Sequence, residues 1–199
     1  MSSLGSREKQ LLLELARRAL ILAVESRESL KDLPVDPILQ QPAGAFITLR
    51  RHARLRGCIG QLPSKDPLVE VVPQCTKAAA LEDPRFDPVR PDELAEIEIE
   101  VSVLSTFEEI TPGQIKVGVH GLVVSRGWQR GVLLPQVARE FQWAAERFLE
   151  ETCIKAGLER EAWKDPGTHV HAFTAEIFTE SEFRLGPQAR SRPGYSTST

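Results

Sequence analysis

The sequence predicts an α+β fold in which helices flank an antiparallel sheet, and three features lead to this prediction. Apolar residues recur at helical spacing between residues 7 and 30. Apolar and polar residues alternate over 97–103, which is typical of a strand with one buried face. Strands and helices are mixed without regular βαβ spacing, and the expected hairpins are short.

The first expected helix covers residues 7–30, with Ser6 as its N-cap. Its apolar residues form one stripe with a period of 3.6 residues: Leu11, Leu12, Leu15, Ala16, Ala19 and Ala23. Residues 31–42 contain three prolines and no periodicity, so we expect a crossing loop there.

Two strands, 44–51 and 55–60, are expected to form a hairpin through a turn at 52–54. A second helix should follow to about residue 82, with Asp66 as N-cap and Pro67 at the first helical position. Pro73 lies within this helix and predicts a kink or a late start.

The chain from residue 83 to 91 holds three prolines and is expected to be irregular, before a helical turn at 92–95. Short strands are expected at 122–125 and 132–134, joined by a turn centred on Gly127. Pro135 should end the second strand.

A helix over 136–156 capped by Gly157 and a last strand over 170–178 complete the expected fold. Residues 186–199 are rich in Ser, Arg, Pro and Thr, which predicts a disordered tail.

Length and composition narrow the class of protein. The 199 residues suffice for one domain of residues 1–185, with or without a smaller lobe. A net charge of −3 argues against a dedicated nucleic-acid binder. Three widely spaced cysteines, no leader segment and no apolar run long enough to span a bilayer predict a cytoplasmic protein with reduced thiols and no membrane contact.

Residues 55–60 read Leu-Arg-Gly-Cys-Ile-Gly, and this segment resembles the six-residue signature of the AMMECR family. Further resemblances follow in the family's order across residues 8–180. They lie at 79–80, 83–86, 98–104, 120–122, 131–137 and 153–158.

The resemblance implies a two-lobed α+β protein with a cleft between its lobes beside the signature. Prokaryotic members of the family are named AmmeMemoRadiSam system protein A, which implies a Memo-like protein and a radical SAM protein as partners. The family carries no settled biochemical activity, so its motif residues enter as candidates.

Three residues are candidates for catalysis: Cys58, Arg56 and His120. On a regular strand Arg56 and Cys58 share a face, so a cation there, or the nearby His52, can favour the thiolate nucleophile. Cysteine is also among the most buried residue types, so a structural role for Cys58 competes with the reactive thiol, and a binding role without covalent chemistry is the third interpretation. His120 precedes a glycine, a setting that suits an exposed base.

Seven further residues are candidates for ligand binding: Gly57, Gly60, Asp83, Arg85, Phe86, Glu100 and Gln136. The glycines permit close approach to the backbone. The loop residues 83–86 are typical of a binding loop, or equally of an Asp–Arg pair and a Phe that pin the loop to the body. Glu98 and Glu100 share a strand face that can do acid–base chemistry or simply meet solvent.

The arginine-rich stretch 50–56 can hold a phosphate, or can be a solvated hairpin turn. His169 and His171 share a strand face but lack a third metal ligand, and no cofactor motif is present, so neither metal nor cofactor is expected.

Three functions follow. The first is an enzyme or enzyme component that binds a small or nucleotide-like anionic ligand beside residues 55–60. The second is a non-catalytic interaction module that docks through its signature. The third and weakest is RNA or nucleotide binding through 50–56.

Overall fold

The structure, a computed structural model, describes residues 4–63, 65–183 and 185 and confirms the α+β fold class. Within these residues the chain forms four α-helices and two four-stranded sheets. It divides into two compact units, which we describe separately. The first unit comprises the described residues of 1–103 and 176–199, and the second comprises residues 104–175.

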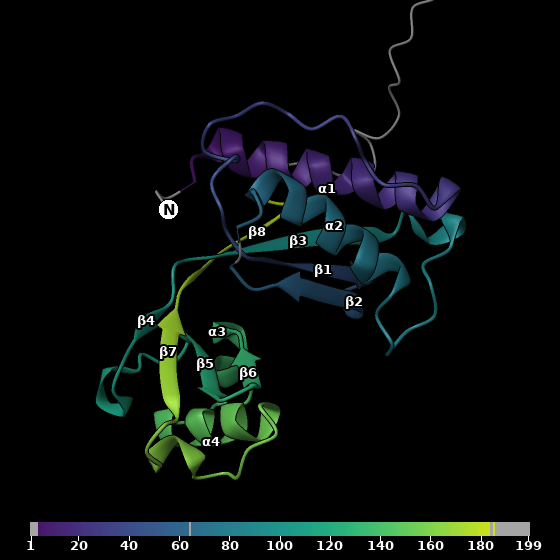
Figure 1. The fold of residues 1–199 in the computed structure, drawn as a ribbon. Helices are drawn as coiled ribbons and strands as arrows, with labels where there is room; N and C mark the ends of the chain where they lie inside the picture. The colour runs from purple at the N-terminus through teal and green to yellow at the C-terminus, as the bar shows by residue number, and fades with distance from the viewer. Residues whose placement is uncertain (1–3, 64, 184, 186–199) are drawn as a thin grey trace, which may run out of the picture. The chain divides into compact units, whose positions relative to one another are not determined.

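The first unit contains a sheet of β1 (Ala45–Arg51), β2 (Arg54–Gln61), β3 (Ile97–Leu104) and β8 (Ala175–Thr179). Its strand order is β2-β1-β3-β8, so β2 lies at an edge. Two helices lie together over one face of this sheet (Figure 1): α1 (Ser6–Ser26) and α2 (Leu68–Leu81). The core between these layers contains Leu12, Leu20, Ile47, Leu49, Val72 and Ile99.

The helix ends differ from the sequence prediction. Ser6 is the first residue of α1 and Gly5 is its N-cap, so the prediction of a Ser6 cap is wrong. The helix ends at Ser26 because Arg27 adopts a left-handed conformation with φ 63°. Pro67 is the N-cap of α2, and Pro73 lies inside the helix.

The predicted hairpin is confirmed as β1–β2. His52 and Ala53 both have positive φ, as a two-residue turn between twisted strands requires. The pairing passes from Leu49–Gly57 to Arg50–Leu55, which leaves Arg56 as an extra residue in a β-bulge. The bulge interrupts the alternation that predicted a shared face for Arg56 and Cys58.

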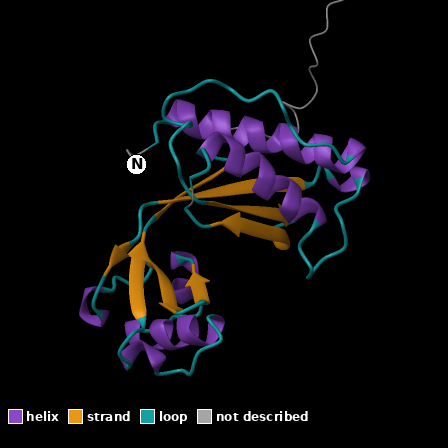
Figure 2. Ribbon diagram, viewed as in Figure 1, coloured by secondary structure: helices purple, strands orange, loops and turns teal. Residues whose placement is uncertain are grey.

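The second unit contains a sheet of β4 (Glu108–Glu109), β7 (His169–Phe173), β5 (Gly121–Arg126) and β6 (Gln129–Leu133), in that order. Its two α-helices are α3 (Pro135–Glu140) and α4 (Ala145–Lys155). The longer helix packs against β5 and β6 (Figure 2) and buries Phe148, Leu149 and Cys153.

Two predicted elements prove to be divided. The helix expected over 136–156 is α3 and α4, separated by residues 141–144, where Gln142 has a φ of 54°. The strand expected over 170–178 is β7 and β8, which belong to different sheets. Gly157 follows α4 with positive φ, as predicted for a helix cap.

Three short 3₁₀ helices lie at Pro91–Glu93, Pro112–Gln114 and Ala162–Lys164, and only the first was foreseen as a helical turn. The predicted tail 186–199 lies outside the described residues. None of the helices in the described chain combines the length and apolar character that crossing a membrane requires.

Candidate functional site

The signature residues 55–60 lie on the edge strand β2. Both signature glycines are required by packing within the protein. A Cβ on Gly57 would lie 2.2 Å from the carbonyl oxygen of Ala79 in α2, and a Cβ on Gly60 would lie 2.2 Å from the ring of Phe46. The close approach predicted for these glycines is therefore made by the protein's own backbone and side chains.

The backbone of Cys58 is held by the loop that follows α2. Its N–H donates to Oδ2 of Asp83 at 2.8 Å, and its carbonyl accepts from Nη2 of Arg85 at 3.1 Å. Because both groups are bonded to this loop, they point away from β1 toward the sheet edge. The Cys58 side chain projects from the face of the sheet, and its thiol accepts a hydrogen bond from Thr48 Oγ1 at 3.4 Å.

Asp83 is buried and makes two hydrogen bonds with the half-exposed guanidinium of Arg85, at 2.9 and 2.7 Å. These bonds hold the pKa of the Asp83 carboxyl well below its usual range. The guanidinium also lies over the ring of Phe86, 5.5 Å from its centroid. These contacts favour the interpretation in which the three loop residues pin the loop to β2.

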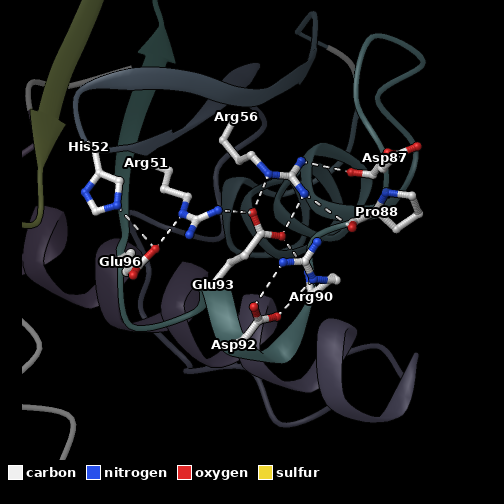
Figure 3. Close-up of polar contacts among 9 residues, drawn as sticks. All are labelled: Arg51, His52, Arg56, Asp87, Pro88, Arg90, Asp92, Glu93 and Glu96. Atoms are coloured by element: carbon white, nitrogen blue, oxygen red, sulfur yellow. Dashed lines mark hydrogen bonds and ion pairs between the residues drawn. The ribbon is translucent and has the colours of Figure 1, made fainter.

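Arg56 is engaged in an ion-pair network centred on Glu93 (Figure 3). Its Nε and Nη2 donate to the two carboxylate oxygens, each at 2.9 Å, and Nη1 donates to the carbonyl of Asp87 at 2.9 Å. Glu93 is only 3% exposed, and the hydrogen bonds from Arg56 lower its pKa to about 2. Arg56 thus neutralises a buried carboxylate, and no described contact joins it to the Cys58 thiol.

Two further arginines of this stretch, Arg50 and Arg51, are also paired with carboxylates. Arg51 donates to Glu93 at 3.1 Å and to Glu96 at 2.5 Å, and His52 Nε2 lies 3.3 Å from the same Glu96 (Figure 3). Arg50 lies 3.8 Å from Glu100. These pairs lower the positive charge that a phosphate or a nucleic acid would meet.

Glu100 lies in line with Cys58 and Thr48 across the three neighbouring strands β2, β1 and β3. The strand register places Cys58 opposite Thr48, and Thr48 opposite Glu100. These three side chains therefore share the sheet face turned away from α1 and α2. Burial raises the pKa of the Glu100 carboxyl.

Two candidate residues, His120 and Gln136, belong to the second unit. His120 precedes β5, and its Nδ1 accepts a hydrogen bond from the backbone N–H of Lys116 at 3.3 Å. Gln136 lies in α3, with its Oε1 buried and without a hydrogen-bond partner in the described chain. Their predicted roles stay predictions, as does a cleft beside the signature that includes them.

A cavity of about 590 Å³ opens in the first unit on the helix side of β2. Ile59, Gly60 and Gln61 of β2 line it. The other lining residues come from α2, α1 and the loop after α1: Ala19, Glu28, Ser29, Leu30, Leu33, Glu70, Pro73, Gln74, Cys75, Lys77, Ala78 and Glu82.

The cavity carries three carboxylates, from Glu28, Glu70 and Glu82, and one ammonium group, from Lys77. Lys77 Nζ bonds Ser29 Oγ at 3.0 Å, across the cavity from α2 to the loop after α1. Cys75 is buried in the wall, where burial raises the pKa of its thiol to about 11. The sequence analysis missed this site, although residues 70, 74 and 77 form a polar stripe at helical spacing.

His169 and His171 lie on β7 with ring centroids 6.4 Å apart, and His169 bonds Glu109 at 3.0 Å. Over residues 4–63, 65–183 and 185, no group of three or more His, Cys, Asp or Glu side chains is arranged to hold a metal ion.

Comparison with known proteins agrees with this arrangement of elements and signature. The model of the AMMECR1 family matches residues 13–178. The chain belongs to the AMMECR1 family. The signature strand β2, the loop of residues 83–86 and the cavity all lie within the matched region.

AMMECR1-family relatives with high similarity are archaeal. A protein of Thermococcus gammatolerans is 46% identical over 195 residues, covering 91% of this chain and 94% of the relative. A protein of Methanothermobacter thermautotrophicus is 44% identical over 183 residues, covering 87% and 94%. The crystal structure of the uncharacterised protein PH0010 from Pyrococcus horikoshii is similar with a TM-score of 0.78 and 43% identity, covering 84% of this chain and 89% of that one.

Proposed function

We propose that this AMMECR1-family chain binds a small molecule in the cavity between α2 and the signature strand. The observation that carries the proposal is the cavity itself, because about 590 Å³ lies within the roughly 300–1,000 Å³ of small-molecule sites. Its walls combine apolar groups such as Ile59 and Leu33 with convergent polar groups such as Gln74 and Lys77. Ligand sites are typically lined in this way.

The charges favour a different ligand from the anion expected from the sequence. Arg56 and Arg85 are hydrogen-bonded to Glu93 and Asp83, and neither lines the cavity. The cavity instead carries more carboxylates than ammonium groups. We therefore propose a ligand that is neutral or positively charged, and keep a nucleotide-like anion as the alternative that the test below must exclude.

Cys58 has a separate place in this proposal. The thiol lies on the sheet face turned away from α2, beside Thr48, while the cavity lies on the helix side. Ligand binding in the cavity therefore does not need the thiol, and Cys58→Ala should bind the same ligands. A catalytic role for Cys58 would require a second substrate on the opposite face.

The test is a thermal-shift screen with a panel of cationic, neutral and anionic metabolites, including polyamines, amino acids, short peptides and nucleotides. The matched variants are Gln74→Trp, which fills the cavity from its rim, and Gln10→Trp, which adds the same ring to an exposed position of α1. We expect at least one cationic or neutral compound, and no nucleotide, to raise the Tm of the wild type and of Gln10→Trp but not of Gln74→Trp. A panel without such a compound overturns the proposal.

A second candidate function is an interaction module, and one observation favours it. Trp128, at the β5–β6 turn of the second unit, is 93% exposed, and large aromatic side chains of this exposure are typical anchors at protein interfaces. We propose the Memo-like and radical SAM proteins implied by the family resemblance as partners, and we propose that the interaction takes place in the cytoplasm. Calorimetric titration with each partner should then show at least roughly tenfold weaker binding for Trp128→Ser; equal affinities would remove Trp128 from the interface.

A further inference from the structure

We infer that the cavity ligand is a short extended peptide segment with a basic side chain, bound as an added strand against Gly60. This inference rests on the proposed function, since it names the ligand class of the same cavity. Three features support it: the backbone of Gly60 on the edge of β2 is unpaired among the described residues, the free edge is short, and the cavity carries more carboxylates than ammonium groups.

The backbone of Gly60 is available for pairing. In an antiparallel pair of strands, opposite residues alternate between positions bonded to the partner strand and positions that point away from it. Cys58 points away from β1, because its N–H and C=O bond to Asp83 and Arg85. Gly60, two residues on and opposite Phe46, therefore points the same way, and in the described chain no hydrogen bond reaches its N–H or C=O.

The available edge is short. Asp83 and Arg85 already occupy the edge at Cys58, as an added strand would. β2 ends at Gln61 on the other side. One peptide residue can therefore exchange both backbone hydrogen bonds with Gly60, and this is the geometry by which peptides extend sheet edges.

Strand alternation then determines where the peptide's side chains lie. The residue opposite Gly60 places its side chain on the face of Phe46, and the residues on either side of it point to the face of Ile59 and α2. On that face the cavity is lined by the carboxylates of Glu70 and Glu82, which lie near opposite ends of α2, and by apolar Ile59 and Ala78. A flanking side chain can therefore reach one of the two carboxylates. A lysine or arginine matches both features, since its stem is apolar and its end group is positive.

The first experiment is an NMR titration of the ¹⁵N-labelled full chain with three probes. They are the tripeptides acetyl-Ala-Lys-Ala-amide and acetyl-Ala-Glu-Ala-amide, and cadaverine, which has the amine without a peptide backbone. We expect the lysine peptide to shift the Gly60 amide signal saturably and to bind at least roughly fivefold more tightly than the other two.

Charge-reversed variants test the same contact from the protein side. Glu70→Lys should weaken the lysine peptide roughly five- to tenfold and improve the glutamate peptide. Glu140→Lys is the matched control, because Glu140 is exposed on α3 and does not line the cavity. The amide spectra of both variants report whether the fold is intact.

Each outcome decides a separate part of the inference. Tighter binding of the glutamate peptide would contradict the proposal that the ligand carries a basic side chain. Cadaverine binding as tightly as the lysine peptide would contradict the proposal that the ligand binds as an added strand. If no probe shifts the Gly60 signal, the peptide inference fails. A cavity-dependent compound in the thermal-shift screen would then still support small-molecule binding, and its absence would remove both.

Discussion

Gly57 shows how a single residue constrains the signature. Any side chain at this position would push a Cβ against the carbonyl oxygen of Ala79 at 2.2 Å, and a helix backbone cannot move aside cheaply. We expect Gly57→Ala to lower the free energy of unfolding by about 1–3 kcal/mol in urea denaturation. Gly113→Ala is the control, because a Cβ there meets nothing within 4 Å; equal losses in both variants would contradict the packing explanation.

The three thiols should differ in their reaction with an alkylating reagent. Cys58 is partly exposed, whereas Cys75 and Cys153 are buried. We therefore expect iodoacetamide to label Cys58 in the native protein, and to label the other two only when the protein unfolds. Peptide mass spectrometry along a time course measures this directly. Protection of Cys58 until unfolding would assign it a purely structural role.

At the scale of elements, the loop between α2 and β3 should control the stability of the protein in acid. The pKa of Glu93 is about 2 in the folded state, below its ordinary value of 4.5, because Arg56 and Arg51 bind the carboxylate. A lowered folded pKa gives stability above pH 4.5 that is lost as the pH falls toward 2, by about 2–3 kcal/mol. Urea midpoints between pH 5 and 2.5 should fall more steeply in the wild type than in Glu93→Gln. Parallel profiles would show that other carboxylates govern acid stability.

The sequence correctly predicted those elements whose local residue pattern agrees with the packing they make in the fold. The β1–β2 hairpin and β3 were predicted because apolar alternation and turn residues coincide. The single helix 136–156 was wrong because periodicity continues across residues 141–144, while Gln142 has a left-handed backbone that polar character alone does not signal. The continuous last strand was wrong because one apolar run serves two sheets, and sheet membership depends on distant partners.

The candidate site was predictable as a segment but not as a set of contacts. The hairpin that carries the signature was predicted and is confirmed as β1–β2, whereas the cavity beside β2 was not predicted. The engagement of Arg56 depends on a β-bulge and on Glu93, 37 residues away, and no local pattern reports such a partner. The cavity depends on how α2 lies against β2 and on the loop after α1, which is a property of packing between distant segments.

At the scale of the whole molecule, the chain leaves the first unit after β3 and returns to it with β8. Arg17 and Glu180 secure the returning segment. Arg17 of α1 makes a buried ion pair with Glu180 and donates to the carbonyl of Ile97 at 2.7 Å, while Glu180 accepts from the N–H of Ile99 at 2.9 Å. Removing one partner leaves the other as an unpaired buried charge, which typically costs about 3–5 kcal/mol.

This ion pair predicts which unit weakens first when it is removed. All three tryptophans, Trp128, Trp143 and Trp163, lie in the second unit, and Cys75 lies in the first. In Glu180→Ala we therefore expect the urea midpoint for Cys75 labelling to fall further than the midpoint for tryptophan fluorescence. The double variant Arg17→Met/Glu180→Leu should recover part of the loss, because no charge is left buried without a partner. Equal shifts of the two midpoints would show instead that the units unfold as one cooperative body, with the returning strand coupling their stabilities.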